Sequence, residues 1–262
     1  MTSTYNLAQK RILVTGASRG LGRAMAEALA RAGASVVFTS RTADDLQQCT
    51  APLREEGWDV YEKVMDVRDE KSIEAVATWV EDKWNRLDVL INNAGIGMRT
   101  VNPAFITDPQ PFFKVSAHGF RDLIETNLTG YFLVSKAFTP MLREAAKGKI
   151  INISMNHETM KRKGFIPYGP SRAGGESLSH IMAEDLRPYN ITVNILLPGG
   201  ATETGMIPEE YKDEIKQHLD LLQPQIMDEP VKFLASDQSD DVTGQRIVAT
   251  EFKEWKDDYF NE

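Results

Sequence analysis

Short runs rich in valine and isoleucine alternate with longer amphipathic stretches along most of this 262-residue chain. Such alternation is typical of repeated βαβ units, in which parallel strands form a central sheet covered by helices. The pattern predicts strands at 11–15, 35–39, 59–65, 88–92, 149–154, 191–197 and 246–249. It predicts helices at 21–31, 44–56, 70–84, 120–144 and 171–187. We therefore expect an α/β fold, a single domain with a doubly wound parallel sheet and helices on both faces.

The composition narrows the range of partners. With 42% hydrophobic and 26% charged residues, the chain can bury the core of one large domain. Acidic residues outnumber basic ones 38 to 30, and the net charge of −8 would repel nucleic acid and anionic membranes. The one long basic run, Lys-Arg-Lys at 161–163, is interpreted as a solvated loop. We expect no nucleic-acid partner and no membrane partner.

Cysteine content and the N-terminus point to an ordinary intracellular protein. Cys49 is the single cysteine, so no internal disulfide is possible, and we expect a surface or half-buried thiol and no metal site. The first ten residues, MTSTYNLAQK, lack the features of a secretory signal. No apolar run reaches the roughly 18 residues that a membrane span needs. The expected location is the cytoplasm.

A glycine-rich turn lies between the first predicted strand and the first helix. Its glycines are spaced G-x-x-x-G-x-G rather than G-x-G-x-x-G, and the turn reads Gly16, Ala17, Ser18, Arg19, Gly20, Leu21, Gly22. Glycines allow tight backbone geometry and let N–H groups approach a pyrophosphate, which the helix N-terminus also attracts. Taken alone, the turn is also consistent with an ordinary connection between strand and helix.

Further segments follow this turn in a fixed order. They are Asp66-Val67 after the third strand, Asn92-Asn93-Ala94-Gly95 after the fourth, Asn127, Tyr168 at a helix start, and Pro198-Gly199 after the sixth strand. From about residue 10 to residue 245, this series resembles the short-chain dehydrogenase/reductase family. The two asparagines, taken singly, are also consistent with a turn at a strand end.

The resemblance implies a Rossmann-type fold that binds a nicotinamide dinucleotide, in a homo-oligomer that is commonly a tetramer or else a dimer. It implies a dinucleotide-binding half at about 10–145 and a catalytic half at about 146–262. Asp66 and Val67 would hold the adenine, and Asn93, Ala94 and Gly95 would line the dinucleotide. The segment that approaches the nicotinamide would include Pro198, Gly199, Thr202 and Thr204. The tail after Gln245 lacks the family's usual glycine pair, so that part of the family interface is not expected here.

The end of the second strand favours NADP(H), with NAD as the alternative. It reads Thr39-Ser40-Arg41 and lacks the acidic residue that would bind a ribose 2′-hydroxyl. Arg41 suits a 2′-phosphate, and Arg19 in the glycine turn could add a second guanidinium. Each arginine, taken singly, is equally consistent with a solvated surface residue.

The catalytic centre retains two of the four residue types that the family uses. Tyr168 stands at the position of the acid/base and Asn127 matches the family's asparagine, but Arg172 occupies the position of the lysine and Met155 that of the serine. A cation beside a phenol favours its ionised form, so Arg172 can supply charge and can also bind the nicotinamide ribose. An arginine does not release a proton, however, and any relay through the family's lysine must be rerouted.

A thioether cannot donate the hydrogen bond that a serine hydroxyl gives to the reacting oxygen. Near Met155, the possible substitutes are Ser154, Asn156 and His157. Ser154 is expected to point to the opposite side if the strand continues through it, which favours the other two. His157 is also consistent with an ordinary loop histidine.

Two loops leave the carboxyl ends of strands, where ligands bind in open α/β sheets. Residues 97–119 and 200–227 are therefore expected at the same end of the sheet, over the nicotinamide half of the cofactor. Their large apolar side chains could form an adaptable substrate wall or serve as packing anchors: Met98, Phe105, Phe112, Phe113, Met160 and Met206.

The sequence thus favours an NADP(H)-dependent oxidoreductase that interconverts a small-molecule alcohol and a carbonyl, with Tyr168 handling the proton. One alternative is a dinucleotide-binding protein with little redox activity, which Met155 and Arg172 favour. Another is a related enzyme that uses the tyrosine for a non-redox proton transfer, such as isomerisation or elimination.

Overall fold

A parallel sheet of seven strands forms the centre of the computed structural model, which describes residues 5–205 and 220–261. The strand order is β3-β2-β1-β4-β5-β6-β7, and every neighbouring pair is parallel. The strands are β1 (Arg11–Thr15), β2 (Ser35–Ser40), β3 (Val60–Val64), β4 (Val89–Asn92), β5 (Gly148–Ile153), β6 (Ile191–Leu197) and β7 (Arg246–Val248). The order reverses between β1 and β4, which is the switch point where α/β sheets bind ligands. The predicted doubly wound, Rossmann-type sheet is confirmed.

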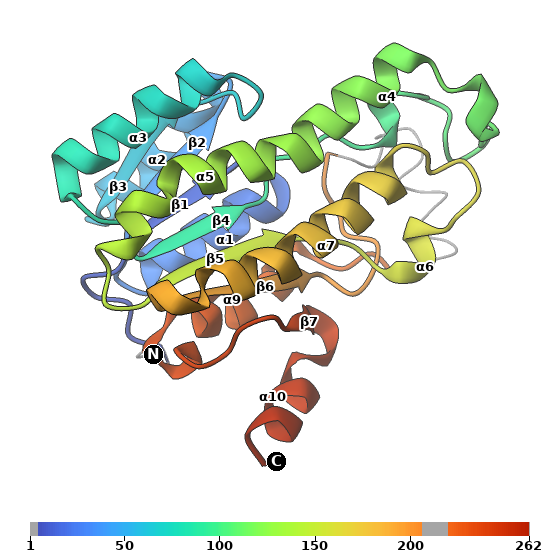
Figure 1. The fold of residues 1–262 in the computed structure, drawn as a ribbon. Coiled ribbons are helices and arrows are strands. Elements are labelled where there is room, and N and C mark those ends of the chain that lie inside the picture. Colours follow the sequence, from blue (N-terminus) through green and yellow to red (C-terminus); the bar gives the residue numbers. More distant parts are fainter. Residues whose placement is uncertain (1–4, 206–219, 262) are drawn as a thin grey trace.

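Helices cover both faces of this sheet (Figure 1). They are α1 (Gly20–Arg31), α2 (Ala43–Glu55), α3 (Glu70–Trp84), α4 (Ala117–Ile124), α5 (Gly130–Arg143), α6 (His157–Met160), α7 (Tyr168–Leu186), α9 (Asp228–Ala235) and α10 (Phe252–Asn261). In β1, Ile12 and Val14 pack into a core shared with α1, α2 and α9, whereas Leu13 packs into a core shared with α3, α5 and α7. Both faces of each inner strand are therefore buried, which explains the continuous apolar runs in the sequence. Within the described ranges, no helix is long and apolar enough to cross a membrane.

The prediction of one continuous helix at 120–144 is wrong. Helix α4 begins at Ala117, because the hydroxyl of Ser116 caps it by accepting from the backbone N–H of Gly119 at 3.0 Å. A π-helical turn at Glu125–Thr129 then separates α4 from α5. Helix α7 begins at Tyr168, as the motif series predicts, and so starts earlier than the range 171–187 predicted from the apolar pattern. Pro170 is tolerated in its first turn, where a backbone N–H is not required.

The C-terminal helices α9 and α10 are absent from the sequence prediction. Helix α10 packs through Phe252 and Trp255, whose rings lie 6.0 Å apart, and through Tyr259, whose ring lies 5.2 Å from that of Trp255. Phe233 of α9 lies 5.5 Å from Phe252. The spacing of these aromatic residues along α10 is helical, and this signal could have identified the helix.

The expectation of a surface or half-buried thiol at Cys49 is also wrong. Cys49 is only 2% exposed and belongs to the core beneath α1 and α2. Its thiol donates to the carbonyl of Ser18 at 3.1 Å, and burial raises the pKa of the thiol. The side chain therefore links α2 to the glycine-rich turn.

Candidate active site

The glycine-rich turn is interlocked with the end of β4. Gly16 and Gly20 have positive φ angles of 65° and 55°, which favour glycine. The side-chain amide of Asn93 donates to the carbonyls of Thr15 at 2.9 Å and Gly16 at 3.1 Å. A Cβ atom on Gly22 would lie 2.3 Å from that amide nitrogen, so a larger residue cannot fit there. The glycines and Asn93 therefore form one packed unit.

Thr15 completes this unit from the strand side. Its hydroxyl oxygen accepts from the backbone N–H groups of Asn93 and Ala94, both at 2.9 Å. The same hydroxyl donates to the carbonyl of Ile91 at 3.2 Å. Asn92 behaves differently, since it is fully buried and its amide donates to Ser135 at 2.9 Å and Asn152 at 2.8 Å. Asn92 thus ties β4 to β5 and α5, and Asn93 alone reaches the turn.

The start of α1 is suited to an anion. Its N-cap residue, Arg19, makes no side-chain capping bond, and the first turn contains no acidic residue. The first N–H groups of the helix are thus not satisfied by a side-chain cap, and the helix dipole favours negative charge there. Arg41 directly follows β2, and within residues 5–205 and 220–261 neither Arg19 nor Arg41 has an ion-pair partner within 4.0 Å. Ser40 instead bonds locally, through its hydroxyl to the carbonyl of Thr42 at 3.0 Å.

Asp66 is fixed by a neighbouring arginine. Arg68 donates to both carboxylate oxygens of Asp66, at 3.1 and 2.8 Å, and also to Asp122 of α4 at 2.7 Å. The hydrogen bond from Arg68 lowers the pKa of Asp66, so its carboxylate stays ionised. Val67 packs against Gly130, where an added Cβ would lie 2.9 Å from its side chain. Arg68 therefore links Asp66 to α4, a role that the motif series does not predict.

Arg172 is buried beside two tyrosines. It is 4% exposed, and its guanidinium carbon lies 5.4 Å from the ring centre of Tyr168 and 5.5 Å from that of Tyr131. Its Nη1 donates to the hydroxyl of Tyr131 at 2.7 Å and to the carbonyl of Ile153 at 2.9 Å. Burial alone would lower the pKa of Arg172, but its interactions with Tyr131 and Tyr168 raise the value overall. Tyr131 was missed by the sequence analysis, although it stands four residues after Asn127 and so shares its helix face.

Asn127 holds the backbone that follows Gly95. In the π-helical turn, its side chain accepts from the N–H of Ile96 at 2.8 Å and donates to the carbonyl of Ile96 at 2.9 Å. Its amide also lies 3.4 Å from the hydroxyl of Ser171, next to Arg172. A Cβ on Gly95 would lie 2.6 Å from Nη2 of Arg172 and 3.1 Å from Oδ1 of Asn127. Gly95, Asn127, Tyr168 and Arg172 are thus brought together.

The segment around Met155 meets a buried carboxylate. Glu176 of α7 accepts from the hydroxyl of Ser154 at 2.5 Å and lies 3.0 Å from Nε2 of His157. Arg246 donates to both oxygens of Glu176 at 3.1 Å and to the backbone carbonyl of Met155 at 2.8 Å. This network fixes the backbone of Met155, and it occupies the hydroxyl of Ser154.

Asn156 reaches the segment after β6. Its amide donates to the carbonyl of Gly199 at 2.9 Å. Gly199 has a φ of 96°, and an added Cβ would lie 2.1 Å from the hydroxyl of Thr250, so glycine is required. Thr202 pairs with Leu222 in a short β-bridge, and the side chain of Thr204 lies near Gly20, 3.2 Å from where its Cβ would be. The described part of this segment therefore runs from β6 to the glycine turn.

The loop at 97–119 packs against the segment before Tyr168. Phe105 lies 5.8 Å from Phe165, ring to ring, and a Cβ on Gly164 would lie 2.6 Å from Pro109. Met98 is buried, whereas Phe112 and Phe113 are 70% and 72% exposed. Both loops leave the carboxyl edge of the parallel sheet, as predicted, but Met206 lies outside the described residues. The wall of apolar side chains is therefore not formed by Phe112 and Phe113, which point largely into solvent.

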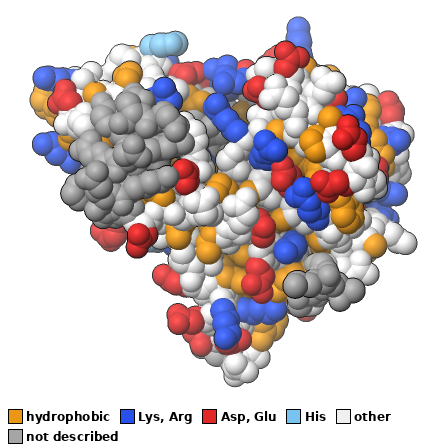
Figure 2. Space-filling view, turned by 180° about the vertical axis from the view of Figure 1, so that it is seen from behind, with side chains coloured by type: hydrophobic (Ala, Val, Ile, Leu, Met, Phe, Trp, Pro, Cys, Tyr) orange, Lys and Arg blue, Asp and Glu red, His pale blue; other side chains and the backbone are white. Residues whose placement is uncertain are grey.

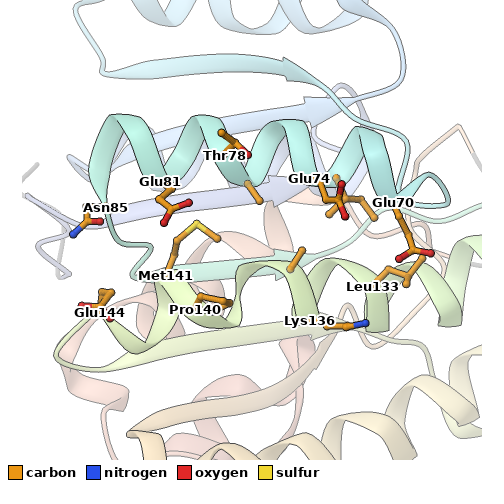
Figure 3. Close-up of a pocket in the computed structure, with 13 residues that line it drawn as sticks. Glu70, Glu74, Thr78, Glu81, Asn85, Leu133, Lys136, Pro140, Met141 and Glu144 are labelled. Carbon is orange, nitrogen blue, oxygen red and sulfur yellow. The ribbon is translucent and has the colours of Figure 1, made fainter.

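A groove away from these residues lies on the helical face of the molecule. It has a volume of about 630 Å³ and runs between α3 and α5, with the acidic side chains of Glu70, Glu74, Glu81 and Glu144 along it (Figure 3). None of the residues that line it belongs to the predicted site. On the reverse face of the molecule, Lys and Arg side chains are interspersed with Asp and Glu side chains (Figure 2). The chemistry-bearing residues gather at the carboxyl edge of the sheet and not in this groove.

Comparisons with known proteins agree with this arrangement. Residues 10–215 match a family model described as short chain dehydrogenase. The chain is 32% identical over 213 residues to gluconate 5-dehydrogenase of Gluconobacter oxydans, covering 80% of this chain and 79% of that protein. It is 32% identical over 248 residues to the 3-oxoacyl-(acyl-carrier-protein) reductase FabG of Vibrio cholerae, covering 92% and 96%. A crystal structure of a short-chain type dehydrogenase/reductase from Mycobacterium marinum superimposes with a TM-score of 0.81 at 25% identity, covering 94% and 96%.

Proposed function

Because the chain belongs to the short-chain dehydrogenase family of oxidoreductases, we propose that it uses NADP(H) to interconvert an alcohol and a carbonyl in a small molecule, with Tyr168 as the acid/base. The observation that supports this most directly is the buried guanidinium of Arg172, 5.4 Å from the ring of Tyr168 at the start of α7. A phenol beside a cation can exchange a proton with a bound alcohol or carbonyl near neutral pH.

The residues of the glycine turn fit a dinucleotide. The close approaches at Gly16 and Gly22 leave no space for side chains, and the start of α1 presents N–H groups to an anion. Within the dinucleotide-binding half, about 10–145, the turn would hold the pyrophosphate, Asp66 and Val67 the adenine, and Ala94 and Gly95 the middle of the cofactor. When bound, the nicotinamide would donate or accept the hydride.

The preference for NADP(H) rests on two arginines. Arg19 lies in the glycine turn and Arg41 directly follows β2, and no carboxylate in the described parts of the chain pairs with either within 4.0 Å. Two guanidinium groups without counter-ions favour a doubly charged phosphate over a neutral hydroxyl. NAD(H) would lack the group that these side chains attract.

In the catalytic half, about 146–262, Arg172 replaces the lysine of the family pattern and keeps only part of its role. It supplies a permanent positive charge beside Tyr168, and its buried Nε has no hydrogen-bond partner within the described residues. It does not pass on a proton, because an arginine stays protonated at all ordinary pH values. The proton of Tyr168 must therefore reach solvent by another path.

Met155 replaces the serine that donates a hydrogen bond to the reacting oxygen. Its neighbours differ in whether their own donors are already used by other groups. Ser154 already donates to Glu176, and Asn156 already donates to Gly199. His157 uses Nε2 toward Glu176, and its side chain is 54% exposed. We assign His157 as the substitute donor, because Glu176 orients the imidazole ring through Nε2 and leaves the other ring nitrogen, Nδ1, for the reacting oxygen.

A second candidate function is a dinucleotide-binding protein with little redox activity. The occupied side chains of Ser154 and Asn156 favour it, because they leave the reacting oxygen with one fewer donor than the family pattern provides. Losing one such donor typically lowers turnover about 10²- to 10³-fold.

Oxidation and reduction across a panel of small alcohols and carbonyls, with NADPH and NADH, test the proposal. We expect turnover with NADPH that Tyr168→Phe abolishes. Cofactor binding by calorimetry without any turnover would support the binding protein instead. Turnover that survives Tyr168→Phe unchanged would rule out the tyrosine as the acid/base.

A further inference from the structure

Tyr131 forms a closed hydrogen-bonded triangle with Arg172 and the backbone of β5. Its hydroxyl accepts from Nη1 of Arg172 at 2.7 Å and donates to the carbonyl of Ile153 at 3.2 Å. The same Nη1 donates to that carbonyl at 2.9 Å. Tyr131 is 3% exposed, so water does not compete for these bonds. The triangle fixes one end of the guanidinium relative to the strand.

The remaining sides of the guanidinium are also enclosed. The rings of Tyr131 and Tyr168 contact it at 5.5 and 5.4 Å, and Gly95 approaches so closely that an added Cβ would lie 2.6 Å from Nη2. An arginine side chain has many rotamers, and burying one in a single orientation requires such restraints. Without the hydroxyl of Tyr131, Nη1 would lose one of these two bonds and keep the one to the carbonyl of Ile153.

The partners that hold Arg172 carry no charge. In the parts of the chain that the structure describes, no carboxylate lies within 4.0 Å of its guanidinium, and the nearest acid along α7, Glu176, is engaged by Ser154, His157 and Arg246. Burial raises the pKa of Tyr131, so its phenol stays neutral. A carboxylate at this place would hold the guanidinium equally well but would neutralise its charge.

From this geometry we infer that Tyr131 is a positioning residue, which holds the guanidinium of Arg172 through a neutral hydrogen bond and so keeps its positive charge for the phenolate of Tyr168. The inference rests on the proposed role of Tyr168 as acid/base. It explains how an arginine can serve at a lysine position, because the longer and forked side chain is anchored at its far end.

Tyr131→Phe tests this inference, because it keeps the ring and removes the hydroxyl. The pH at which Tyr168 ionises is measured as phenolate absorbance, from the difference between each protein and its Tyr168→Phe counterpart. We expect the Tyr168 phenolate to form about one pH unit higher in Tyr131→Phe, which corresponds to a tenfold weaker stabilisation. Turnover at neutral pH should fall about tenfold and recover at high pH, with KM nearly unchanged.

Tyr189→Phe is the matched control, since its ring also contacts an arginine, Arg143, at 4.3 Å but on the surface. It should leave both the absorbance titration and turnover unchanged. A Tyr131→Phe protein that melts at a lower temperature but titrates like the parent would overturn the inference, as would equal shifts in both variants.

The absorbance titration does not depend on redox activity. If the parent shows no turnover but Tyr131→Phe still shifts the Tyr168 phenolate, the proposed function fails and the positioning role stands. If Tyr131→Phe does not fold, Tyr131→Gln, which can accept the same bond, should fold and titrate like the parent. If Tyr131→Gln folds like the parent but forms the Tyr168 phenolate more than one pH unit higher, the role of the hydrogen bond is refuted.

Discussion

Gly95→Ala should disable the site through a single added carbon. The new Cβ would lie 2.6 Å from Nη2 of Arg172 and 3.1 Å from Oδ1 of Asn127. An unstrained contact needs about 3.5 Å or more, so the guanidinium must retreat by about 1 Å. It cannot do so freely, because Tyr131 and the carbonyl of Ile153 hold its other end at 2.7 and 2.9 Å. We expect the free energy of unfolding to fall by about 1–3 kcal/mol and turnover to fall about 10²-fold.

Gly148→Ala separates the two effects. Its Cβ would also meet an atom at 2.6 Å, the carbonyl oxygen of Leu142, but at the amino end of β5, away from the site. Urea unfolding should show a comparable or larger loss of stability in this control, because backbone cannot move aside. Turnover per folded molecule should remain that of the parent. The reasoning fails if Gly95→Ala keeps full turnover, or if Gly148→Ala loses as much turnover as Gly95→Ala.

Three further predictions concern Arg41, Arg172 and Asp228. Arg41→Ala should weaken NADPH binding by about 1.5–3 kcal/mol and NADH binding much less; calorimetry giving equal effects would contradict the assignment of the 2′-phosphate site. Arg172→Lys should lower both cofactor affinity and turnover, because the shorter side chain of lysine would not reach the acceptors that Nη1 contacts at Tyr131 and Ile153. Adding Met155→Ser should not restore them, and a large gain in the steady-state turnover of the double variant would refute this. Burial raises the pKa of Asp228 to about 6, and its Oδ1 has no hydrogen-bond partner among the described residues. The ionised carboxylate of Asp228 therefore destabilises the folded state. A carboxyl group with a raised pKa costs the folded state no stability at low pH and destabilises it once the group ionises. Asp228→Asn should therefore stabilise the protein by about 1 kcal/mol above pH 7, after allowance for solvent screening, and should not change its stability below pH 4. Thermal melts at the two pH values measure this difference.

The sheet could be predicted from sequence because its strands are buried on both faces. A run such as that of β6, Ile191–Leu197, is buried at every position and is therefore apolar or β-branched almost throughout. Two of the seven predicted strands, β1 and β6, have the predicted bounds, and the other five differ by one residue at one or both ends. Helix α10 was missed because its apolar face rests on few aromatic residues among many charges.

The position at the carboxyl edge of the sheet could be predicted from sequence for the motif residues that directly follow a strand, because the apolar pattern identifies those strands. Tyr131 and Arg68 could not, because each acts through contacts with residues that are remote in sequence, Arg172 and Asp122. The break between α4 and α5 was also missed. It coincides with the π-helical turn that carries Asn127, whose side chain bonds the backbone of Ile96 and competes with regular helix geometry.

The interlock between the glycine turn and β4 has a thermodynamic consequence for any dinucleotide that binds. Because Asn93 and Thr15 already hold the turn in shape, its backbone entropy is lost during folding and not again on binding. The pyrophosphate therefore meets a preorganised surface. Arg19 and Arg41 are exposed, and each must give up rotamer freedom of up to about 2 kcal/mol when it closes on a phosphate. Affinity for the pyrophosphate thus comes from a rigid turn, whereas selectivity for the 2′-phosphate comes from two flexible side chains. As the temperature rises, the preference for NADP(H) over NAD(H) should therefore fall before the affinity for the dinucleotide does.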